Sequence, residues 1–500
     1  MQAGEKITLK ELLSAALNLP VQTDCWLTGL ALDSRKVQSG DLFLAYPGTT
    51  LDGRDFIDAA VNNGAVAVLC SDEIPKQLNL PLAVPIIVVP NLKTQVGLIA
   101  AQFYGYPSQH LTVIGVTGTN GKTSVVQFIA TALTALQVPC GMISTLGYGF
   151  PQELTALMNT TPDPVTLQRI LFKLKKAGAR AVVIEVSSHA LVQQRTNGIN
   201  FKLAVFTNLS RDHLDYHGNM ADYGSAKKLL FVREGLQYAI INADDDFGQR
   251  LLKELPQTLQ VYAYTTTPLE TRGVVIRARN FSGDITGITA DVTTPWGVGT
   301  LKSSLLGRFN LSNLLAVTTV LGVMQLNLKL ALAAIAELQT VRGRLQAFRR
   351  HKKPLIVVDY AHTPDALEQV LLVLREYCHG ALWCVFGCGG DRDYGKRPIM
   401  GQIVERYSDH IIITNDNPRT EDPQRIINDI LQGLLCPWAA EVEPDRRVAI
   451  MHAIDCAQAN DVVLIAGRGH EEYQIIGNDR LPFSDVEVVR EIVKGEEVVS

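Results

Sequence analysis

One stretch decides how this chain is interpreted: Gly115-Val116-Thr117-Gly118-Thr119-Asn120-Gly121-Lys122-Thr123-Ser124. It joins an apolar run to an amphipathic run, which predicts a strand, a glycine loop and a helix. Glycines in such a loop let backbone N–H groups converge on phosphate oxygens, while Lys122 supplies positive charge and the Thr123 hydroxyl can bind Mg²⁺. The strict spacing of a phosphate loop needs glycine at the position of Val116. The strand-loop-helix context nevertheless favours phosphate binding over a chance glycine-rich turn.

The sequence on both sides of this loop alternates between strand-like and helix-like segments. We expect strands at residues 111–116, 140–144, 181–186 and 203–208, and helices at residues 124–136 and 166–177. This alternation predicts βαβ units and a parallel sheet covered on both faces. Residues 273–306 are rich in Val, Thr and Gly, which predicts added antiparallel hairpins, and helices are expected at 311–325 and 330–338.

Length and pattern together predict three domains of the α/β class. A chain of 500 residues corresponds to about three domains of ~150 residues. We expect a small N-terminal α/β domain at residues 1–107, a central phosphate-loop domain with a parallel sheet at 108–340, and a C-terminal domain at 341–500. The last is predicted to be doubly wound and Rossmann-like, with strands at 355–359, 382–386, 411–414 and 462–466.

The composition is that of an ordinary globular protein and excludes several classes of function. With 47% hydrophobic and 19% charged residues, the chain is neither disordered nor fibrous. A net charge of −4 without a dense basic run argues against nucleic acid as a main partner. Eight cysteines without a CxxC pair favour neither a disulfide framework nor a zinc site. No segment resembles a secretion signal or a bilayer span, so we expect a cytoplasmic protein without membrane insertion.

Two segments of the central block carry ionisable side chains just after predicted strands. Glu185 ends the strand at 181–185, at the sheet edge where ligands collect, and could hold the Mg²⁺ that Thr123 also binds. Residues 206–218 crowd arginine, aspartate and histidine together, and His213 suggests a second metal or an acid-base role. A terminal glutamate is more often solvated and a single histidine more often structural. Their position after strands of the phosphate-loop sheet favours the functional interpretation.

Four polar loops follow the predicted strands of the C-terminal domain, at residues 359–364, 387–393, 416–419 and 467–471. The second departs from the dinucleotide-binding pattern GxGxxG, because Arg392 stands where the last glycine should be. Each loop alone could be a simple turn. Four of them at one sheet edge predict a composite binding site.

Taken together, these segments resemble the Mur ligase family of ATP-dependent amide-bond-forming enzymes. The resemblance covers nearly the whole chain, from Leu32-Asp33-Ser34-Arg35 through GTNGKT, NTTP, EVSSH, NLSRDHLDYHG, GRFNLSNLLA, DYAHTPDAL, GCGGDRD and DNPR to GRGHE. It implies an enzyme that uses ATP and Mg²⁺ to activate a carboxylate as an acyl phosphate, which an amine then attacks. The motifs look like those of members that add the third amino acid to UDP-N-acetylmuramoyl-L-alanyl-D-glutamate in peptidoglycan precursor synthesis.

The resemblance also implies roles for individual residues. The UDP end of the sugar nucleotide is expected at Leu32, Ser34, Thr49, Thr50 and Leu51, and its sugar-peptide portion at Asn159, Thr160, Thr161, Ser187, Gln193 and Arg195. The ATP phosphates are expected at Gly118, Thr119, Asn120, Gly121, Lys122, Thr123 and Ser124, and the rest of the nucleotide at Asn310, Arg344, Asp359 and His362. Catalytic roles are expected for Lys122, Glu185, His213 and Lys227, and metal binding for Thr123, Glu185, His213 and Lys227.

For Lys227 the resemblance implies a covalent modification. The lysine that matches it is carbamylated in family members with this motif. Carbamylation would turn a cation into an anion able to bind metal, which suits a site that includes His213. A solvated surface lysine is the alternative, and neighbouring Lys228 fits that description.

The DNPR motif at residues 416–419 resembles the version in family members that add meso-diaminopimelate. The planar fork of Arg419 can grip a second carboxylate, which L-lysine lacks. Further contacts are expected from Arg392, Asp416, Asn417, Pro418, Gly467 and Glu471. The implied partners are therefore UDP-N-acetylmuramoyl-dipeptide and meso-diaminopimelate, and we expect a monomer.

Two alternatives stay open at this point. A fold relative such as folylpolyglutamate synthetase would share the nucleotide site, but a UDP-binding N-terminal module would have no role there. The other alternative is a nucleotide-binding regulatory protein that has lost catalysis. The intact set Lys122, Glu185, His213 and Lys227 argues against it.

Overall fold

The computed structural model describes residues 7–48, 51–74, 84–268, 273–284, 287–349 and 353–493. The chain divides into two compact units, the first made of Met1–Thr117, Gln137–Val205 and Ala226–Tyr238, and the second of Gly118–Leu136, Phe206–Ser225 and Ala239–Ser500. Both contain helices and largely parallel strands, which confirms the α/β class. The three-domain division at residues 107 and 340 stays a prediction. None of the helices in the described ranges is long and apolar enough to cross a membrane.

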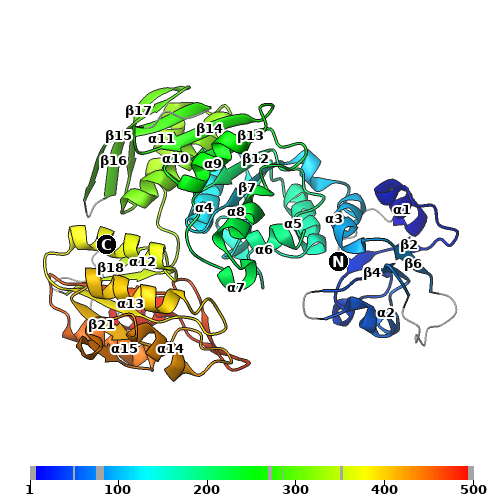
Figure 1. The fold of residues 1–500 in the computed structure, drawn as a ribbon. Helices are drawn as coiled ribbons and strands as arrows, with labels where there is room; N and C mark the ends of the chain where they lie inside the picture. Colours follow the sequence, from blue (N-terminus) through cyan, green and yellow to red (C-terminus); the bar gives the residue numbers. More distant parts are fainter. Residues whose placement is uncertain are drawn as a thin grey trace. The chain divides into compact units, whose positions relative to one another are not determined.

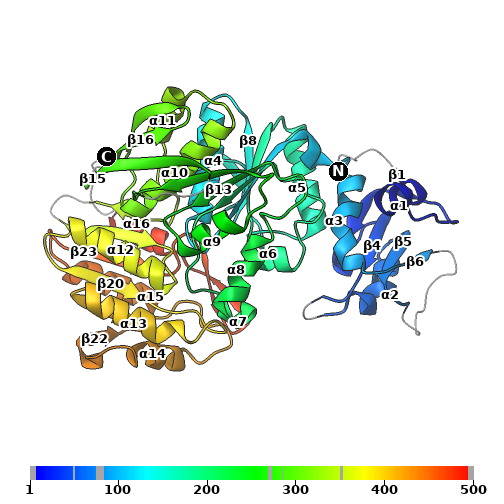
Figure 2. The ribbon, with the colours of Figure 1, turned by 45° about the horizontal axis from the view of Figure 1, so that its top comes forward.

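The first unit contains a four-stranded parallel sheet between helices. Its strands lie in the order β3 (Gly29–Ala31), β4 (Asp41–Ala45), β5 (Ala67–Ser71) and β6 (Ile86–Val89). Leu42 and Leu44 of β4 belong to the core formed with α1 (Leu9–Leu17) and α3 (Leu92–Phe103). Phe43 and Ala45 belong to the core formed with α2 (Ile57–Asn62), which Figure 2 shows beside this sheet. Because both faces are buried, β4 is an unbroken apolar run after Asp41.

A second set of strands in the first unit includes the strand that leads to the phosphate loop. The order is β10 (Glu153–Thr155), β9 (Gly147–Phe150), β8 (Cys140–Ser144), β11 (Ala181–Glu185), β7 (Thr112–Thr117) and β12 (Leu203–Phe206). β8, β11 and β7 are parallel, and Glu185 pairs with Val116. Helices α5 (Pro164–Lys176) and α6 (Ser188–Val192) complete this part. The carboxyl ends of β7 and β11 therefore meet at one edge, as the alternation predicts.

The second unit holds the phosphate-loop helix α4 (Lys122–Ala135) and a group of strands that ends in hairpins. Its strands are β13 (Tyr238–Asn242), β14 (Gln260–Thr265), β15 (Val274–Asp284), β16 (Gly287–Thr294) and β17 (Gly297–Ser303). The last three are antiparallel, which confirms the hairpins expected at residues 273–306. Helices α9 (Asp246–Glu254), α10 (Arg308–Val323) and α11 (Leu328–Ala336) accompany them, as Figure 1 shows.

The same unit contains a six-stranded, mainly parallel sheet with helices on both faces, as predicted for a doubly wound fold. The strand order is β18 (Gln346–Phe348), β19 (Leu355–Asp359), β23 (Val462–Ala466), β20 (Leu382–Phe386), β21 (His410–Ile413) and β22 (Ala440–Val442). One core is formed with α12 (Pro364–Tyr377), α13 (Lys396–Tyr407) and α14 (Pro423–Leu431). The core on the other face is formed with α15 (Arg446–Cys456) and α16 (Asp485–Val493). A hairpin of β24 (Tyr473–Ile476) and β25 (Asp479–Pro482) lies between β23 and α16 in the chain.

Candidate active site

The phosphate loop is shaped by two glycines with positive φ. Gly118 has a φ of 150° and Gly121, which precedes α4, a φ of 81°. A Cβ atom on Gly118 would lie 1.9 Å from Thr207 Oγ1, and one on Gly121 would lie 2.6 Å from Asn313 Oδ1. The backbone can therefore pass close to its neighbours only without side chains at these two positions. Among the described residues no side chain caps α4 at Gly121, which suits a helix N-terminus that binds phosphate.

Lys122 lies over the loop that precedes it. Its Nζ donates hydrogen bonds to the carbonyl oxygens of Gly118 at 3.1 Å and of Thr119 at 2.7 Å. The ammonium group is thus held at the loop by backbone oxygens. A phosphate bound there would meet a cation whose position is already restricted.

The segment that follows β12 anchors the loop from the other side. Thr207 Oγ1 donates to the Asn120 carbonyl at 2.6 Å, and Asn208 Oδ1 accepts from the Asn120 backbone N–H at 2.8 Å. Asn120 Nδ2 in turn donates to Asp365 Oδ2, at the start of α12, at 3.0 Å. Burial raises the pKa of Asp365. Thr207, Asn208 and Asp365 were not predicted as site residues, although Asn208 and Asp365 lie in motifs that carried the resemblance and Thr207 directly precedes one of them.

A cavity of about 360 Å³ lies beside the loop, within the second unit. Its wall includes Asn120, Gly121 and Ser124 of the phosphate loop together with Asn310, Arg344 and Asp359. These last three were expected around the nucleotide, and they come from segments far apart in the sequence. The volume falls within the range of about 300 to 1,000 Å³ that small-molecule sites occupy.

Arg344 links this cavity to Thr123. Its Nη2 donates to Thr123 Oγ1 at 3.4 Å, and its guanidinium lies 4.3 Å from the centre of the Tyr360 ring. Its Nε is buried without a hydrogen-bond partner in the described ranges. Asp359 is buried nearby and accepts from the backbone N–H groups of Leu345 at 2.6 Å and Ala361 at 2.7 Å. Burial raises the pKa of Asp359, and the positive charge of Arg344 opposes that rise.

A buried carboxylate brings together two histidines that were predicted as site residues. Asp212 Oδ2 lies 3.2 Å from His213 Nε2 and 3.8 Å from His362 Nε2. His362 Nδ1 is 2.8 Å from the carbonyl oxygen of Tyr360, which fixes the ring orientation. Burial would raise the pKa of Asp212, but the hydrogen bond from His362 and the charges of both histidines hold it well below its usual value. These contacts therefore favour the charged form of Asp212 between the two imidazoles.

Glu185 is nearly fully buried in the first unit and joins two of the predicted substrate segments. Its Oε2 accepts from the Thr145 backbone N–H at 3.2 Å and from Thr145 Oγ1 at 3.1 Å. Thr145 Oγ1 also lies 3.1 Å from Thr160 Oγ1. Thr161 Oγ1 donates to the Glu185 carbonyl at 2.6 Å and accepts from the Ser187 N–H at 3.1 Å. The segments that carry the NTTP and EVSSH motifs thus form one hydrogen-bonded group.

Arg195 extends this group toward the N-terminal sheet. Its Nη1 donates to the Thr161 carbonyl at 2.9 Å, while Nε and Nη2 donate to Gln193 Oε1 at 2.9 and 2.6 Å. The pKa of Tyr46 is raised to about 12, mainly by burial and then by the negative charge of Asp163. The positive charge of Arg195 opposes this rise. Tyr46, which follows β4 directly, is therefore close enough to Asp163 and Arg195 to feel their charges. It was not predicted from the sequence, and its place after a parallel strand is the signal that could have found it.

The remaining residues expected to bind UDP or sugar occupy varied positions in the first unit. Ser34 is buried at the start of a short 3-10 turn, and its carbonyl accepts from Asn63 Nδ2 at 2.9 Å. Leu32 is half-buried, whereas Leu51 and Asn159 are exposed. Thr49 and Thr50 lie outside the described residues. Their roles stay predictions.

Lys227 is 1% exposed, near the end of α8 (Met220–Lys228). Lysines are almost never fully buried unless they are paired, so this side chain has a specific polar environment. The alternative of a solvated surface lysine is wrong for Lys227. Lys228, which is half-buried, fits it better.

Arg419 is held by its backbone and by one side-chain nitrogen. Its φ is 55°, its N–H donates to the Ile475 carbonyl at 3.1 Å, and Nη1 donates to the Gly390 carbonyl at 2.8 Å and the Asn417 carbonyl at 3.3 Å. Nε and Nη2 form no hydrogen bond with any residue that the structure describes, so one edge of the guanidinium is available. Burial, and then the charge of Arg392, lower the pKa of Arg419.

Asn417 organises the side chains around Arg419. Its Oδ1 accepts from Arg468 Nη1 and from the Ile475 N–H, both at 2.8 Å, and its Nδ2 donates to Glu471 Oε2 at 2.8 Å. Arg468 is completely buried and also donates to the Tyr473 carbonyl. Burial and then the charge of Asp416 raise the pKa of Glu471. No role was predicted for Arg468, yet it holds this group together.

The other predicted members of this site lie close by. Gly467 has a φ of 113°, and a Cβ atom there would lie 2.8 Å from Asp416 Oδ2. The buried Pro418 presents its carbonyl to Gly390, where a Cβ would lie only 1.9 Å away. Arg392 is exposed and acts on Arg419 through its charge. The loops at residues 387–393, 416–419 and 467–471 therefore lie close together, and the composite binding site expected from four loops stays a prediction.

Comparison with known proteins gives the same interpretation. Three family models match the chain: the Mur ligase family catalytic domain at residues 27–104, the Mur ligase middle domain at 116–321 and the Mur ligase glutamate ligase domain at 343–469. The chain belongs to the Mur ligase family. The resemblance inferred from GTNGKT, DNPR and the other motifs is thereby confirmed.

Individual members of the family are similar over nearly the whole length. UDP-N-acetylmuramoyl-L-alanyl-D-glutamate–2,6-diaminopimelate ligase of Coxiella burnetii is 48% identical over 96% of this chain and 98% of the relative. A solved structure of a ligase with the same name is 36% identical, with a TM-score of 0.69, and the match covers 98% of this chain and 99% of that one.

A Mycobacterium tuberculosis folylpolyglutamate synthase complexed with ADP and AMPPCP is 19% identical, with a TM-score of 0.62, over 80% of this chain and 95% of that one. At this identity the similarity is one of fold alone.

Proposed function

We propose that this Mur ligase joins meso-diaminopimelate to the D-glutamyl carboxylate of UDP-N-acetylmuramoyl-L-alanyl-D-glutamate at the expense of ATP. The carboxylate receives the terminal phosphoryl group of ATP and becomes an acyl phosphate, and the amine of the amino acid then displaces phosphate. We further propose that the enzyme works as a monomer in the cytoplasm, on peptidoglycan precursors.

The cavity beside the phosphate loop is the observation that carries the ATP-dependent part of the proposal. Gly121 and Ser124 on its wall would hold phosphates, while Asn310, Arg344 and Asp359 would surround the rest of the nucleotide. Arg344 supports this because its Nε is buried without a partner in the described chain, and a ligand atom would satisfy it. Lys122, fixed by two loop carbonyls, would neutralise charge on the transferred phosphoryl group.

The side chains present fit Mg²⁺ as a metal that ATP brings with it. The described residues contain no group of three or more His, Cys, Asp or Glu side chains that could hold a metal. Mg²⁺ usually needs only one or two protein ligands, because water and phosphate oxygens complete its shell. The candidates for these one or two ligands are Thr123 and His213 in the second unit, and Glu185 and carbamylated Lys227 in the first unit. When bound, the ion would offset negative charge on the phosphates.

The amine substrate is proposed from the site around Arg419. The free edge formed by Nε and Nη2 suits a carboxylate, and Asp416 and Glu471 suit an ammonium group. An amino acid with a carboxylate and an ammonium at its far end satisfies both, and meso-diaminopimelate has them. In the first unit, Asn159, Thr160, Thr161, Ser187, Gln193 and Arg195 are proposed to bind the sugar-peptide portion, and Leu32, Ser34 and residues 49–51 the UDP end.

An isotope experiment tests the acyl-phosphate step. The acceptor dipeptide is prepared with oxygen-18 in the D-glutamyl carboxylate and incubated with ATP and meso-diaminopimelate. One labelled oxygen should appear in the released phosphate, because the acyl phosphate loses its bridging oxygen to phosphate. Label that remains only in the peptide product contradicts the mechanism.

The two alternatives predict different results with the same enzyme. A folylpolyglutamate synthetase would release ADP with a folate and glutamate rather than with the UDP-linked acceptor. A nucleotide-binding protein without catalysis would bind ATP but release no ADP with both proposed substrates present. ADP release that requires the UDP-linked dipeptide and meso-diaminopimelate excludes both.

A further inference from the structure

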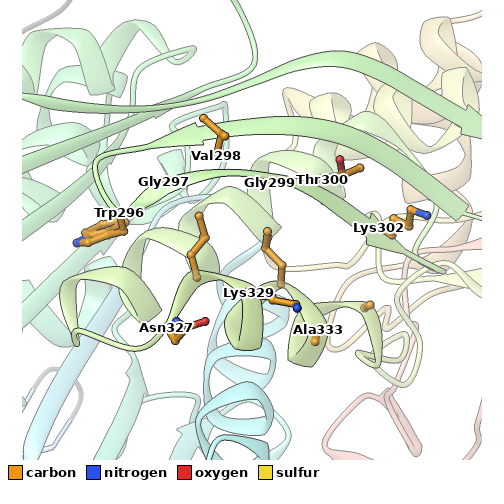
Figure 3. Close-up of a pocket in the computed structure, with 12 residues that line it drawn as sticks. Trp296, Gly297, Val298, Gly299, Thr300, Lys302, Asn327, Lys329 and Ala333 are labelled. Carbon is orange, nitrogen blue, oxygen red and sulfur yellow. The ribbon is translucent and has the colours of Figure 1, made fainter.

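A groove in the second unit is lined by none of the residues assigned to the proposed reaction. It has a volume of about 580 Å³ and runs between strand β17 and helix α11. Figure 3 shows Val298, Thr300 and Lys302 on the strand, with Lys329 and Ala333 on the helix opposite. The groove therefore has one wall made of strand and one made of helix.

The strand wall is an open sheet edge. β17 is the last strand of its sheet, with β16 as its partner on one side and no other strand of the described chain on its outer side. An edge strand presents backbone N–H and C=O groups to which a further strand can pair. Val298 on this edge is 77% exposed, so its side chain does not cover the edge.

The bottom of the groove is apolar, and the absence of a side chain at Gly299 lets the helix approach the strand. A Cβ atom on Gly299 would lie 2.6 Å from Leu332 Cδ1, and one on Gly297 would lie 3.5 Å from Leu328 Cδ2. Leu328 and Leu332 line the groove, and Trp296 lies at the turn before β17. An extended segment beside β17 would place every second side chain over these leucines.

The charges in the groove all have one sign. Lys302 of β17 and Lys329 of α11 line it, and no acidic side chain does among the described residues. Neither lysine forms an ion pair with another residue of the described ranges. An occupant with carboxylates would complement them, whereas a second copy of this edge would bring more lysines.

From these features we infer that the groove between β17 and α11 binds an extended, acidic peptide segment of another protein, which adds to β17 as a further strand. Backbone pairing supplies much of the affinity in this mode of recognition, and side-chain charge supplies selectivity. The site is separate from the proposed ligase reaction and does not depend on it.

Binding is measured by fluorescence anisotropy of labelled five-residue peptides with the full-length protein. The first peptide alternates glutamate and valine, the second replaces each glutamate with lysine, and the third is the first with N-methyl groups on alternate residues, which blocks strand pairing. We expect the first to bind and the other two to bind at least about tenfold more weakly. Equal binding of the first and third peptides overturns strand addition, and equal binding of the first and second overturns the charge argument.

Charge reversal then locates the site. The double variant Lys302→Glu with Lys329→Glu should weaken binding of the acidic peptide by about tenfold or more, with unchanged ligase activity. Lys253→Glu, on the exposed side of α9, is the matched control and should leave binding unchanged. Binding that survives the double variant, or that falls equally in the control, overturns the assignment. A dimer in sedimentation that the double variant disrupts would show a second copy in the groove and also overturn it.

Discussion

Arg419 is the side chain on which the choice of amino acid is expected to depend. Replacing it with lysine keeps the charge but removes the planar fork. In the structure Nη1 is occupied by the carbonyls of Gly390 and Asn417, so Nε and Nη2 form the edge that we propose for the substrate carboxylate. A lysine ammonium cannot bond both the Gly390 carbonyl and two carboxylate oxygens in this geometry.

The expected magnitude follows from the number of hydrogen bonds lost. Arg419→Lys should lose one charge-assisted hydrogen bond, about 1.5 to 3 kcal/mol, or roughly 10- to 160-fold in kcat/KM for meso-diaminopimelate. The loss should appear mainly in KM for the amino acid, while KM for ATP stays the same. L-lysine should be a poor substrate of the unmodified enzyme by roughly 10⁴ to 10⁵, because it leaves the guanidinium edge desolvated without a partner.

The assay is ADP release at saturating ATP and UDP-linked dipeptide, with each amino acid varied in turn. Arg447→Lys, which alters an exposed arginine paired with Glu491, is the matched control. It should change neither kcat nor KM for meso-diaminopimelate. A preference of the unmodified enzyme for L-lysine would refute the assignment of Arg419 while leaving the ligase reaction intact. Unchanged kinetics in Arg419→Lys would refute the argument from the fork.

Three further predictions concern other parts of the chain. Lys227→Ala should lose most activity but still bind ATP, and short carboxylic acids should partly restore turnover by replacing the carbamate anion. Gly118→Ala should weaken ATP binding at least about tenfold, because its Cβ would meet Thr207 Oγ1 at 1.9 Å. Burial and nearby cations lower the pKa of His470 to about 3. The protein should therefore become less stable as pH falls below about 6.5, by up to about 4 kcal/mol near pH 3. The melting temperature of His470→Gln should therefore fall less than that of the unmodified protein over this pH range.

Matched controls separate these effects from general damage. Lys228→Ala should keep its activity, and equal losses in both lysine variants would contradict a special role for Lys227. Gly178 also has a positive φ, 91°, but a methyl group added there would meet nothing within 4 Å, so Gly178→Ala should leave ATP binding intact. The predicted loss of stability at low pH has this sign because, between the two pKa values of His470, the folded state binds fewer protons than the unfolded state. A constant difference in melting temperature across that range would contradict it.

Most of the architecture was predictable from local pattern. The apolar run before GTNGKT forms β7, and the runs at 355–359, 382–386 and 462–466 form strands with these same bounds, because buried parallel strands leave long apolar stretches between glycine turns. Helix boundaries that depend on capping residues differ more between the prediction and the structure. The helix expected from residue 124 begins at Lys122, since Gly121 with its positive φ lets the turn close two residues earlier. The pair β9 and β10 was not predicted, because three or four residues carry too little periodicity.

The sequence by itself determined which chemistry this protein can perform, because glycines at fixed spacing, Lys122 and the DNPR motif each encode local geometry. The tertiary structure alone decided which distant residues share a site. Asn120 meets Asp365 across 245 positions of the chain, Asp212 lies between His213 and His362, and Arg468 reaches Asn417. The surroundings of Tyr46, Asn313 and the free edge of Arg419 likewise became known only from the tertiary structure. The local sequence pattern shows the hydrophobic period and the capping residues of each helix or strand. Hydrogen-bond partners and burial instead depend on how parallel strands bring their carboxyl ends to one edge of the sheet.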